Sequence, residues 1–102
     1  MEKVGIFFRL QKGKEAEYER LHARIPDGVS SALTEAGIVN YTIWRRDDLL
    51  FAYYETQDPE RAGKILGQNE SYLEWRKRMR RYVFETPDGQ NEWFMKKVFS
   101  HD

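Results

Sequence analysis

The feature that most constrains the fold of this chain is a pair of strand-like segments. Both segments have apolar or aromatic residues on both faces. Residues 38–45 (IVNYTIWR) and 49–55 (LLFAYYE) are rich in β-branched and aromatic residues, which favour strands. The polar residues 46–48 between them form a short turn, so the pair is predicted to be a β-hairpin. In the first strand we expect Val39, Tyr41 and Ile43 to share one face. A sheet with one wet side alternates apolar and polar residues, so this sheet must be covered on both faces.

The other patterns along the chain give an order of elements. They predict a strand at 4–10, helices at 14–26 and 27–36, the hairpin, helices at 58–67 and 70–82, and a last strand at 93–99. Proline interrupts the first helix, and Asp58-Pro59 starts the third. The order β-α-α-β-β-α-α-β is that of an α+β, ferredoxin-like split βαβ domain with an antiparallel four-stranded sheet. Its helices cover one face, so the aromatic second face is expected either to pack on a twin in a homodimer or to line a ligand cavity.

Length and composition limit the classes of protein to which this chain can belong. A length of 102 residues suits one domain spanning residues 1–102. Lys plus Arg and Asp plus Glu are 17 each, and this zero balance argues against broad attraction to nucleic acid or membrane. The chain has no cysteine, hence no thiolate metal site, and no apolar run of membrane-spanning length. We therefore expect a soluble cytoplasmic protein with no nucleic-acid or membrane partner.

The first helix contains the best candidate for proton chemistry. Tyr18, Leu21, His22 and Ile25 recur at i, i+3, i+4 and i+7 and so share one face. Tyr18 and His22 place a phenol and an imidazole one turn apart, and His22 is the one histidine outside the C-terminal tail. The alternative is a structural histidine, buried and hydrogen-bonded to a backbone carbonyl. No metal-ligand spacing, phosphate loop or nucleophile motif accompanies the pair, so no metal or other cofactor is expected.

The fourth helix has a basic segment and an aromatic flank. Residues 76–81 hold five basic side chains in six positions, which fits either an anion or nucleic-acid site or a solvated helix face. Trp75 lies on the aromatic flank of the same helix, where it fits either the core or a binding site.

The ordered set Tyr18-x-x-x-His22, Asn40-Tyr41-x-Ile43, Leu49-Leu50-Phe51-Ala52 and Trp75 before Met79 resembles the L-rhamnose mutarotase family over nearly the whole chain. The resemblance implies a dimeric α/β barrel of ferredoxin-like subunits. It also implies interconversion of the α and β anomers of a free sugar by general acid–base catalysis, without a metal or an organic cofactor.

The resemblance also implies roles for individual residues. His22 matches the catalytic acid/base, Tyr18 and Tyr41 match sugar-contacting tyrosines, and Trp75 with Arg76 matches a pair of adjacent tryptophans. Because Arg76 replaces one tryptophan, a second hypothesis is that the substrate is a more polar or acidic sugar whose carboxylate Arg76 binds. A non-catalytic sugar-binding dimer of the same fold is the alternative function, and an interaction module using the basic segment is a third.

Overall fold

The computed structural model describes all residues, 1–102, and has the predicted order of elements. The chain runs β1 (Glu2–Arg9), α1 (Glu15–His22), α2 (Asp27–Glu35), β2 (Val39–Arg46), β3 (Leu49–Thr56), α3 (Pro59–Leu66), α4 (Glu70–Met79) and β4 (Trp93–Met95). The four strands form one sheet in the order β2-β3-β1-β4, and every neighbouring pair is antiparallel. The predicted α+β, ferredoxin-like architecture is confirmed.

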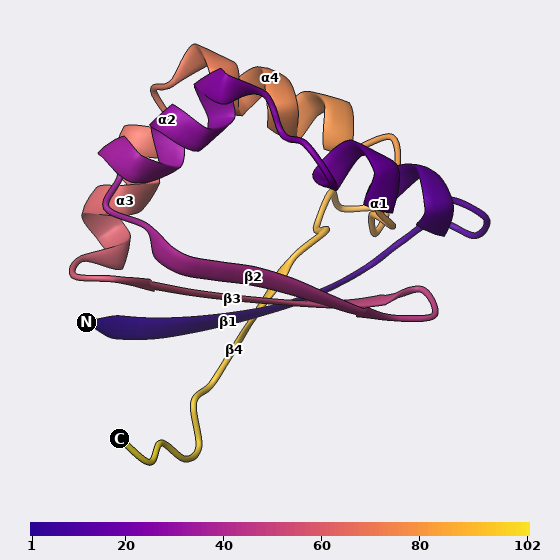
Figure 1. Ribbon diagram of the computed structural model, residues 1–102. Helices are drawn as coiled ribbons and strands as arrows, with labels where there is room; N and C mark the ends of the chain where they lie inside the picture. Colours follow the sequence, from indigo (N-terminus) through magenta and orange to yellow (C-terminus); the bar gives the residue numbers. More distant parts are fainter.

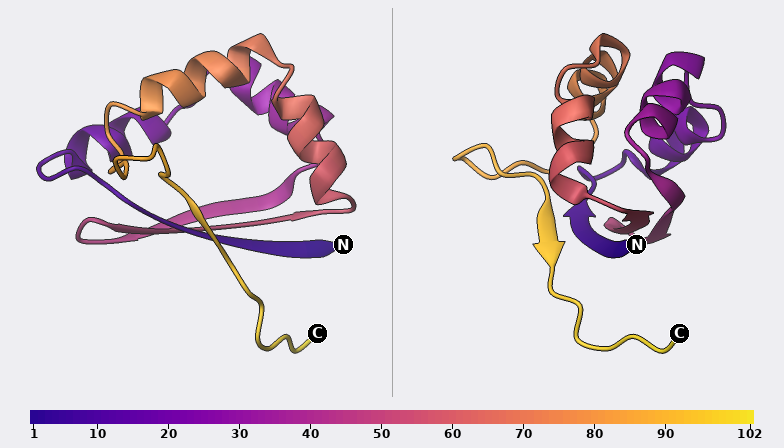
Figure 2. Two further views of the ribbon diagram at one scale, coloured as in Figure 1. Left: turned by 180° about the vertical axis from the view of Figure 1, so that it is seen from behind. Right: turned by 90° about the vertical axis from the view of Figure 1, so that its left-hand side faces the viewer.

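The helices lie on one face of the sheet and leave the other uncovered (Figures 1 and 2). On the covered face β1 contributes Ile6 and Phe8 to the core, and β3 contributes Leu50 and Ala52 from directly opposite positions. These side chains pack with Tyr18 and Leu21 of α1, Val29 of α2, and Trp75 and Met79 of α4. The core therefore lies between the helix layer and the inner face of the sheet.

Local chemistry sets the ends of α3 and α4. The Asp58 side chain accepts a hydrogen bond from the backbone N–H of Arg61, and the Asn69 side chain accepts one from Tyr72, so both residues are N-caps. The predicted end of α4 at Tyr82 is wrong by three residues. After Met79 the chain leaves the helix because its backbone bonds to the end of β1: Gln11 N–H donates to Tyr82 and Phe84 N–H to Arg9.

A β-bulge in β2 changes one predicted face. Val39 pairs with Glu55 and Thr42 pairs with Tyr53, so β2 has one residue more than β3 over this stretch. Asn40 takes up the difference with φ of 52°, a left-handed conformation that asparagine tolerates better than most residues. Val39 therefore shares the outer face with Thr42, and the prediction that it lies on the face of Tyr41 and Ile43 is wrong.

The last strand is shorter than predicted: only Trp93–Met95 pairs with β1, and residues 96–99 do not extend it. The register places Gly5 opposite Met95, so two further pairs would set Lys3 opposite Lys97. Like charges directly opposite one another destabilise a strand pair. Lys3 instead forms an ion pair with Asp102 at 2.6 Å. The residues after β4 leave the sheet and end below it in the view of Figure 1.

A row of aromatic side chains crosses the uncovered face of the sheet. The paired positions Trp44–Phe51, Phe51–Phe7 and Phe7–Trp93 follow one another from β2 to β4. The Phe7 ring centroid lies 5.5 Å from that of Phe51 and 6.1 Å from that of Trp93, and Trp44 is 67% exposed. We call these four residues the aromatic row.

No helix is both long and apolar enough to span a bilayer.

Candidate active site

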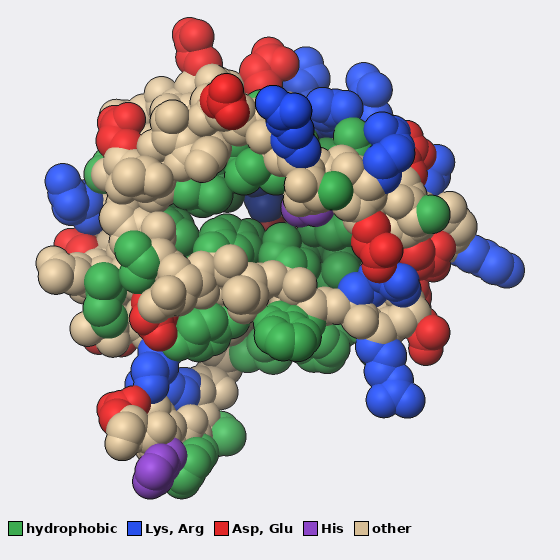
Figure 3. All heavy atoms as spheres, viewed as in Figure 1, with side chains coloured by type: hydrophobic (Ala, Val, Ile, Leu, Met, Phe, Trp, Pro, Cys, Tyr) green, Lys and Arg blue, Asp and Glu red, His purple; other side chains and the backbone are tan.

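A cavity of about 350 Å³ opens between the helix layer and the inner face of the sheet. Its volume is within the range of roughly 300 to 1,000 Å³ that is usual for small-molecule sites. Figure 3 shows hydrophobic side chains gathered around the hollow between helices and sheet. The lining is mostly hydrophobic and comprises Ile6, Phe8, Tyr18, His22, Ile25, Val29, Leu33, Tyr41, Ile43, Ala52, Tyr72, Trp75, Arg76, Met79, Arg80, Val83, Asn91 and Glu92.

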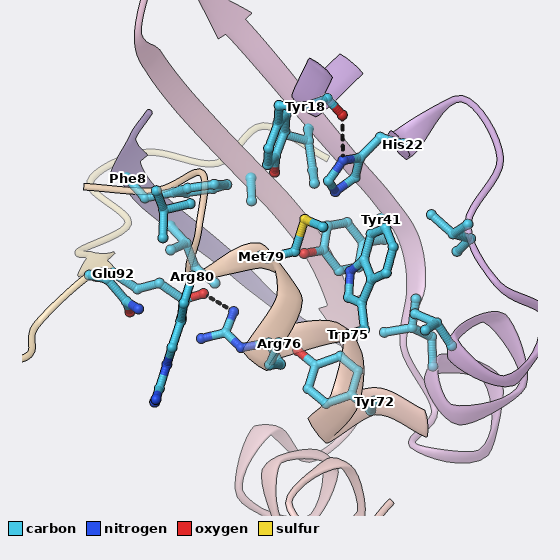
Figure 4. Close-up of a pocket in the computed structure, with 18 residues that line it drawn as sticks. Phe8, Tyr18, His22, Tyr41, Tyr72, Trp75, Arg76, Met79, Arg80 and Glu92 are labelled. Atoms are coloured by element: carbon cyan, nitrogen blue, oxygen red, sulfur yellow. Dashed lines mark hydrogen bonds and ion pairs between the residues drawn. The ribbon is translucent and has the colours of Figure 1, made fainter. Parts of the chain in front are cut away.

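All five residues singled out from the sequence lie on this one lining: Tyr18 and His22 from α1, Tyr41 from β2, and Trp75 and Arg76 from α4. They are drawn together in Figure 4. The structure thus brings the five together from three elements that are up to 58 residues apart in the chain. Their individual roles stay predictions.

His22 is held in one orientation by its own helix. Its Nδ1 lies 2.9 Å from the carbonyl oxygen of Tyr18, marked by a dashed line in Figure 4. A carbonyl oxygen can only accept, so Nδ1 carries the proton and donates it. In the neutral ring Nε2 then has a free lone pair. The hydrogen bond expected of a structural histidine is therefore present, but in a ring that also lines the cavity.

The surroundings of His22 favour the neutral ring. Burial lowers the pKa of His22 below its ordinary value of 6.5, although the bond to the Tyr18 carbonyl acts in the opposite direction. The imidazole stacks on the Tyr18 ring with centroids 4.0 Å apart, and it forms a T-shaped pair with the Trp75 ring at a centroid distance of 5.2 Å. At neutral pH the site therefore contains an oriented base between two aromatic rings.

The two tyrosines present hydroxyl groups that the protein does not use. Neither the Tyr18 nor the Tyr41 hydroxyl has a hydrogen-bond partner within the chain, and no buried side-chain polar atom is left unsatisfied. The Tyr18 hydroxyl is thus open to the cavity. Burial raises the pKa of both phenols above 10.0, so they stay protonated and are able to donate hydrogen bonds to a ligand.

The bulge at Asn40 sets the direction of Tyr41. Without the extra residue, Tyr41 and Val39 would share a face. With it, Val39 turns to the outer face while Tyr41 lies on the cavity lining. Bulges frequently re-aim side chains beside active sites, and this one brings a strand tyrosine to the cavity.

Trp75 belongs to both the core and the cavity, so the two alternatives drawn from the sequence are not exclusive. It is 9% exposed and packs in the main core, yet its ring also lines the cavity. The Arg78 guanidinium lies 5.9 Å from the ring centroid. Its burial between core and cavity fixes the ring beside His22.

Arg76 is not a free cation. It forms an ion pair and hydrogen bond with Glu92, drawn as a dashed line in Figure 4. Glu92 compensates its charge, which removes the main support for the hypothesis that Arg76 binds a carboxylate of the substrate. The other four basic residues of the segment are exposed, as in a solvated helix face, and one of them, Arg80, also borders the cavity.

Sequence reasoning missed Glu92, Tyr72 and Asn91 as lining residues. Glu92 follows the turn at residues 86–89 in a segment without regular periodicity, so no pattern marks its direction. Tyr72 lies on α4 three residues before Trp75, and this helical spacing is the signal that points to it. No group of three or more His, Asp or Glu side chains is arranged to hold a metal ion.

Comparison with known proteins identifies the family. The family model described as L-rhamnose mutarotase matches residues 3–101. An L-rhamnose mutarotase from Burkholderia orbicola is 33% identical over 92 residues, 88% of each chain. One from Listeria monocytogenes is 31% identical over 90 residues, 86% of each chain. The crystal structure of an L-rhamnose mutarotase from Formosa agariphila has the same fold, with a TM-score of 0.83 at 21% identity over the full length of both chains. The chain therefore belongs to the L-rhamnose mutarotase family.

Proposed function

We propose that this protein is a mutarotase, an isomerase that interconverts the α and β anomers of L-rhamnose or a related free aldose, and that residues 1–102 form one domain for this purpose. The relatives named as L-rhamnose mutarotases match most of the chain, and this does not favour the alternative of a non-catalytic sugar-binding protein. A cytoplasmic location is part of the proposal.

The observation that carries the mechanism is the hydrogen bond from His22 Nδ1 to the Tyr18 carbonyl. It leaves Nε2 as the base that takes the proton from the anomeric hydroxyl. The bond between the anomeric carbon and the ring oxygen then breaks, and the ring oxygen takes up a proton. Because both oxygens are bonded to the same carbon, the imidazolium formed in the first step is placed to return that proton. Rotation of the open-chain aldehyde and reversal of the steps give the other anomer.

The remaining lining positions the sugar. Tyr18 and Tyr41 donate hydrogen bonds from hydroxyl groups that the protein leaves free, and the Trp75 ring forms an apolar surface for the C–H face of the sugar. General acid–base catalysis by a positioned side chain contributes about 10²–10⁴-fold, which is enough for a reaction that also proceeds slowly in water.

We further propose that the protein is a homodimer in which two copies pack through the aromatic row, in the manner of a dimeric α/β barrel. Figure 2 shows that no helix covers this face of the sheet. The strand register places the four aromatic side chains of the row next to one another across it. Such a surface is a liability when it is left in water, and a symmetric pair of copies covers it with a single kind of contact.

Saturation-transfer NMR at the anomeric protons tests the function. The panel holds L-rhamnose, L-fucose, D-galactose and D-galacturonate, each with wild type, His22→Ala and His101→Ala. His101 is the only other histidine and lies exposed in the tail, so its variant is a matched control. We expect wild type and His101→Ala to accelerate exchange for at least one sugar, and His22→Ala to lose that acceleration by about 10²-fold or more. A folded wild type that accelerates none of them would contradict the proposal.

A further inference from the structure

The Arg76–Glu92 pair forms a polar surface of the cavity that the mechanism does not use. Arg76 comes from α4, and Glu92 from the segment just before β4, 16 residues later. Figure 4 shows the pair apart from the His22 ring, with Met79 drawn between them in this view. A sugar with its anomeric carbon at His22 would therefore present other parts of its ring to the pair.

Both side chains keep hydrogen-bonding capacity beyond the bond they share. Arg76 uses one nitrogen, Nη1, toward Glu92, and Glu92 uses one oxygen, Oε1; the Tyr72 hydroxyl also lies beside the Arg76 guanidinium. A guanidinium has five N–H donors, and a carboxylate accepts at both oxygens. The side chains are 40% and 26% exposed, so both can be reached by a ligand. Together they offer a donor next to an acceptor.

We propose that Glu92 is a specificity-determining residue. Together with Arg76 it forms hydrogen bonds with neighbouring hydroxyl groups of a neutral sugar, and its negative charge excludes acidic sugars. This inference rests on the proposed function, since it assumes that the cavity takes a sugar. A hydroxyl group both donates and accepts, so one can accept from Arg76 while its neighbour donates to Glu92. A carboxylate can only accept, and placed against Arg76 it would also lie beside the negative charge of Glu92.

The charge balance explains why Arg76 alone does not make an acid-binding site. With Glu92 in place, the charge of Arg76 is compensated within the cavity, and Arg80, the other cation on the lining, is exposed to solvent. Without the carboxylate of Glu92, Arg76 becomes an uncompensated guanidinium in a mostly apolar cavity, which binds a carboxylate well. The identity of residue 92 therefore sets the sign of the preference between neutral and acidic sugars.

The experiment compares binding of a matched pair of ligands, D-galactose and D-galacturonate, which differ at one carbon that carries a hydroxymethyl group or a carboxylate. NMR titrations followed at the Trp75 indole give the dissociation constant of each sugar. The variants are Glu92→Gln, Arg76→Gln and, as a matched control, Glu85→Gln. Glu85 is an exposed carboxylate in the same segment and does not line the cavity.

We expect Glu92→Gln to change the ratio of the two dissociation constants by at least about tenfold in favour of galacturonate. In this variant the galacturonate carboxylate can form a hydrogen-bonded ion pair with Arg76, which Glu92 no longer occupies. Arg76→Gln should shift the ratio the other way, and Glu85→Gln should leave it near that of wild type. If galacturonate binds no better to Glu92→Gln than to wild type, or gains equally with Glu85→Gln, the inference is wrong. Because binding is the readout, a wild type without anomer exchange would refute the function separately.

Discussion

Replacing Trp44 with serine is expected to convert the proposed homodimer to monomers at concentrations where wild type stays dimeric. Trp44 lies at the β2 end of the aromatic row and is its most exposed member, at 67%. Its indole N–H is already satisfied by the Thr42 hydroxyl at 3.1 Å. The substitution therefore removes apolar surface without leaving a buried polar group unpaired, and it leaves the inner core untouched.

The size of the effect follows from the exposed area. A tryptophan side chain presents roughly 250 Å² at most, so the exposed fraction of Trp44 corresponds to about 170 Å². At about 25 cal/mol per Å², covering it contributes up to about 4 kcal/mol in each protomer. A symmetric interface uses the residue twice. Truncation of an aromatic hot-spot residue costs about 2 kcal/mol or more, and Trp44 occurs twice in the interface, so the dimer dissociation constant should rise at least about 100-fold.

Sedimentation-equilibrium or light-scattering masses over a dilution series measure that constant. Leu73→Ser is the matched control, because Leu73 is a 47% exposed hydrophobic residue on α4, in the helix layer that covers the opposite face of the sheet. We expect the control to dimerise like wild type. Equal dissociation constants for Trp44→Ser and wild type, or a wild type that is monomeric at micromolar concentration, would refute the assignment of the interface.

Two further predictions concern His22 and Asn40. Because burial lowers the pKa of His22, the rate of anomer exchange should stay constant as the pH falls to 6.5 and decrease only below it. A midpoint above 6.5 in the pH–rate profile would disprove the neutral base. The same lowered pKa makes folding stability complete above pH 6.5 and reduces it as the pH falls toward the folded-state pKa, so urea midpoints at pH 7.5 and 5 should differ less in His22→Gln. Asn40→Val should destabilise the fold by about 1–3 kcal/mol, because a β-branched residue is strained at φ of 52°. Asn40→Gly should cost less in the same denaturation series, and equal stabilities would argue against the bulge.

The parts of the site that the sequence predicts are those with a regular period. Tyr18 and His22 recur one helical turn apart, and that spacing alone places them on one face. Trp75 and Arg76 are adjacent on α4, and the family resemblance singled them out. The order of strands and helices is predicted for the same reason, because each element has its own hydrophobic period.

The parts that the sequence does not predict depend on contacts between distant segments. The bulge at Asn40 has no signature beyond the residue type, yet it decides on which faces Val39 and Tyr41 lie. The early end of β4 depends on Lys3, at the other end of the chain. Glu92 reaches Arg76 from an irregular segment, so the charge balance of the cavity is visible only in three dimensions.

The protonation state of His22 gives the most direct test of the proposed mechanism. The chain has only two histidines, so ¹⁵N-histidine-labelled protein at pH 7 gives the imidazole signals of these two residues. The signals that disappear in His22→Ala belong to His22. We predict that His22 is neutral, with the proton on Nδ1 and an unprotonated Nε2 whose resonance shifts when L-rhamnose is added. A proton on Nε2, or a charged ring at pH 7, would contradict the account, because His22 would then have no lone pair with which to accept the anomeric proton.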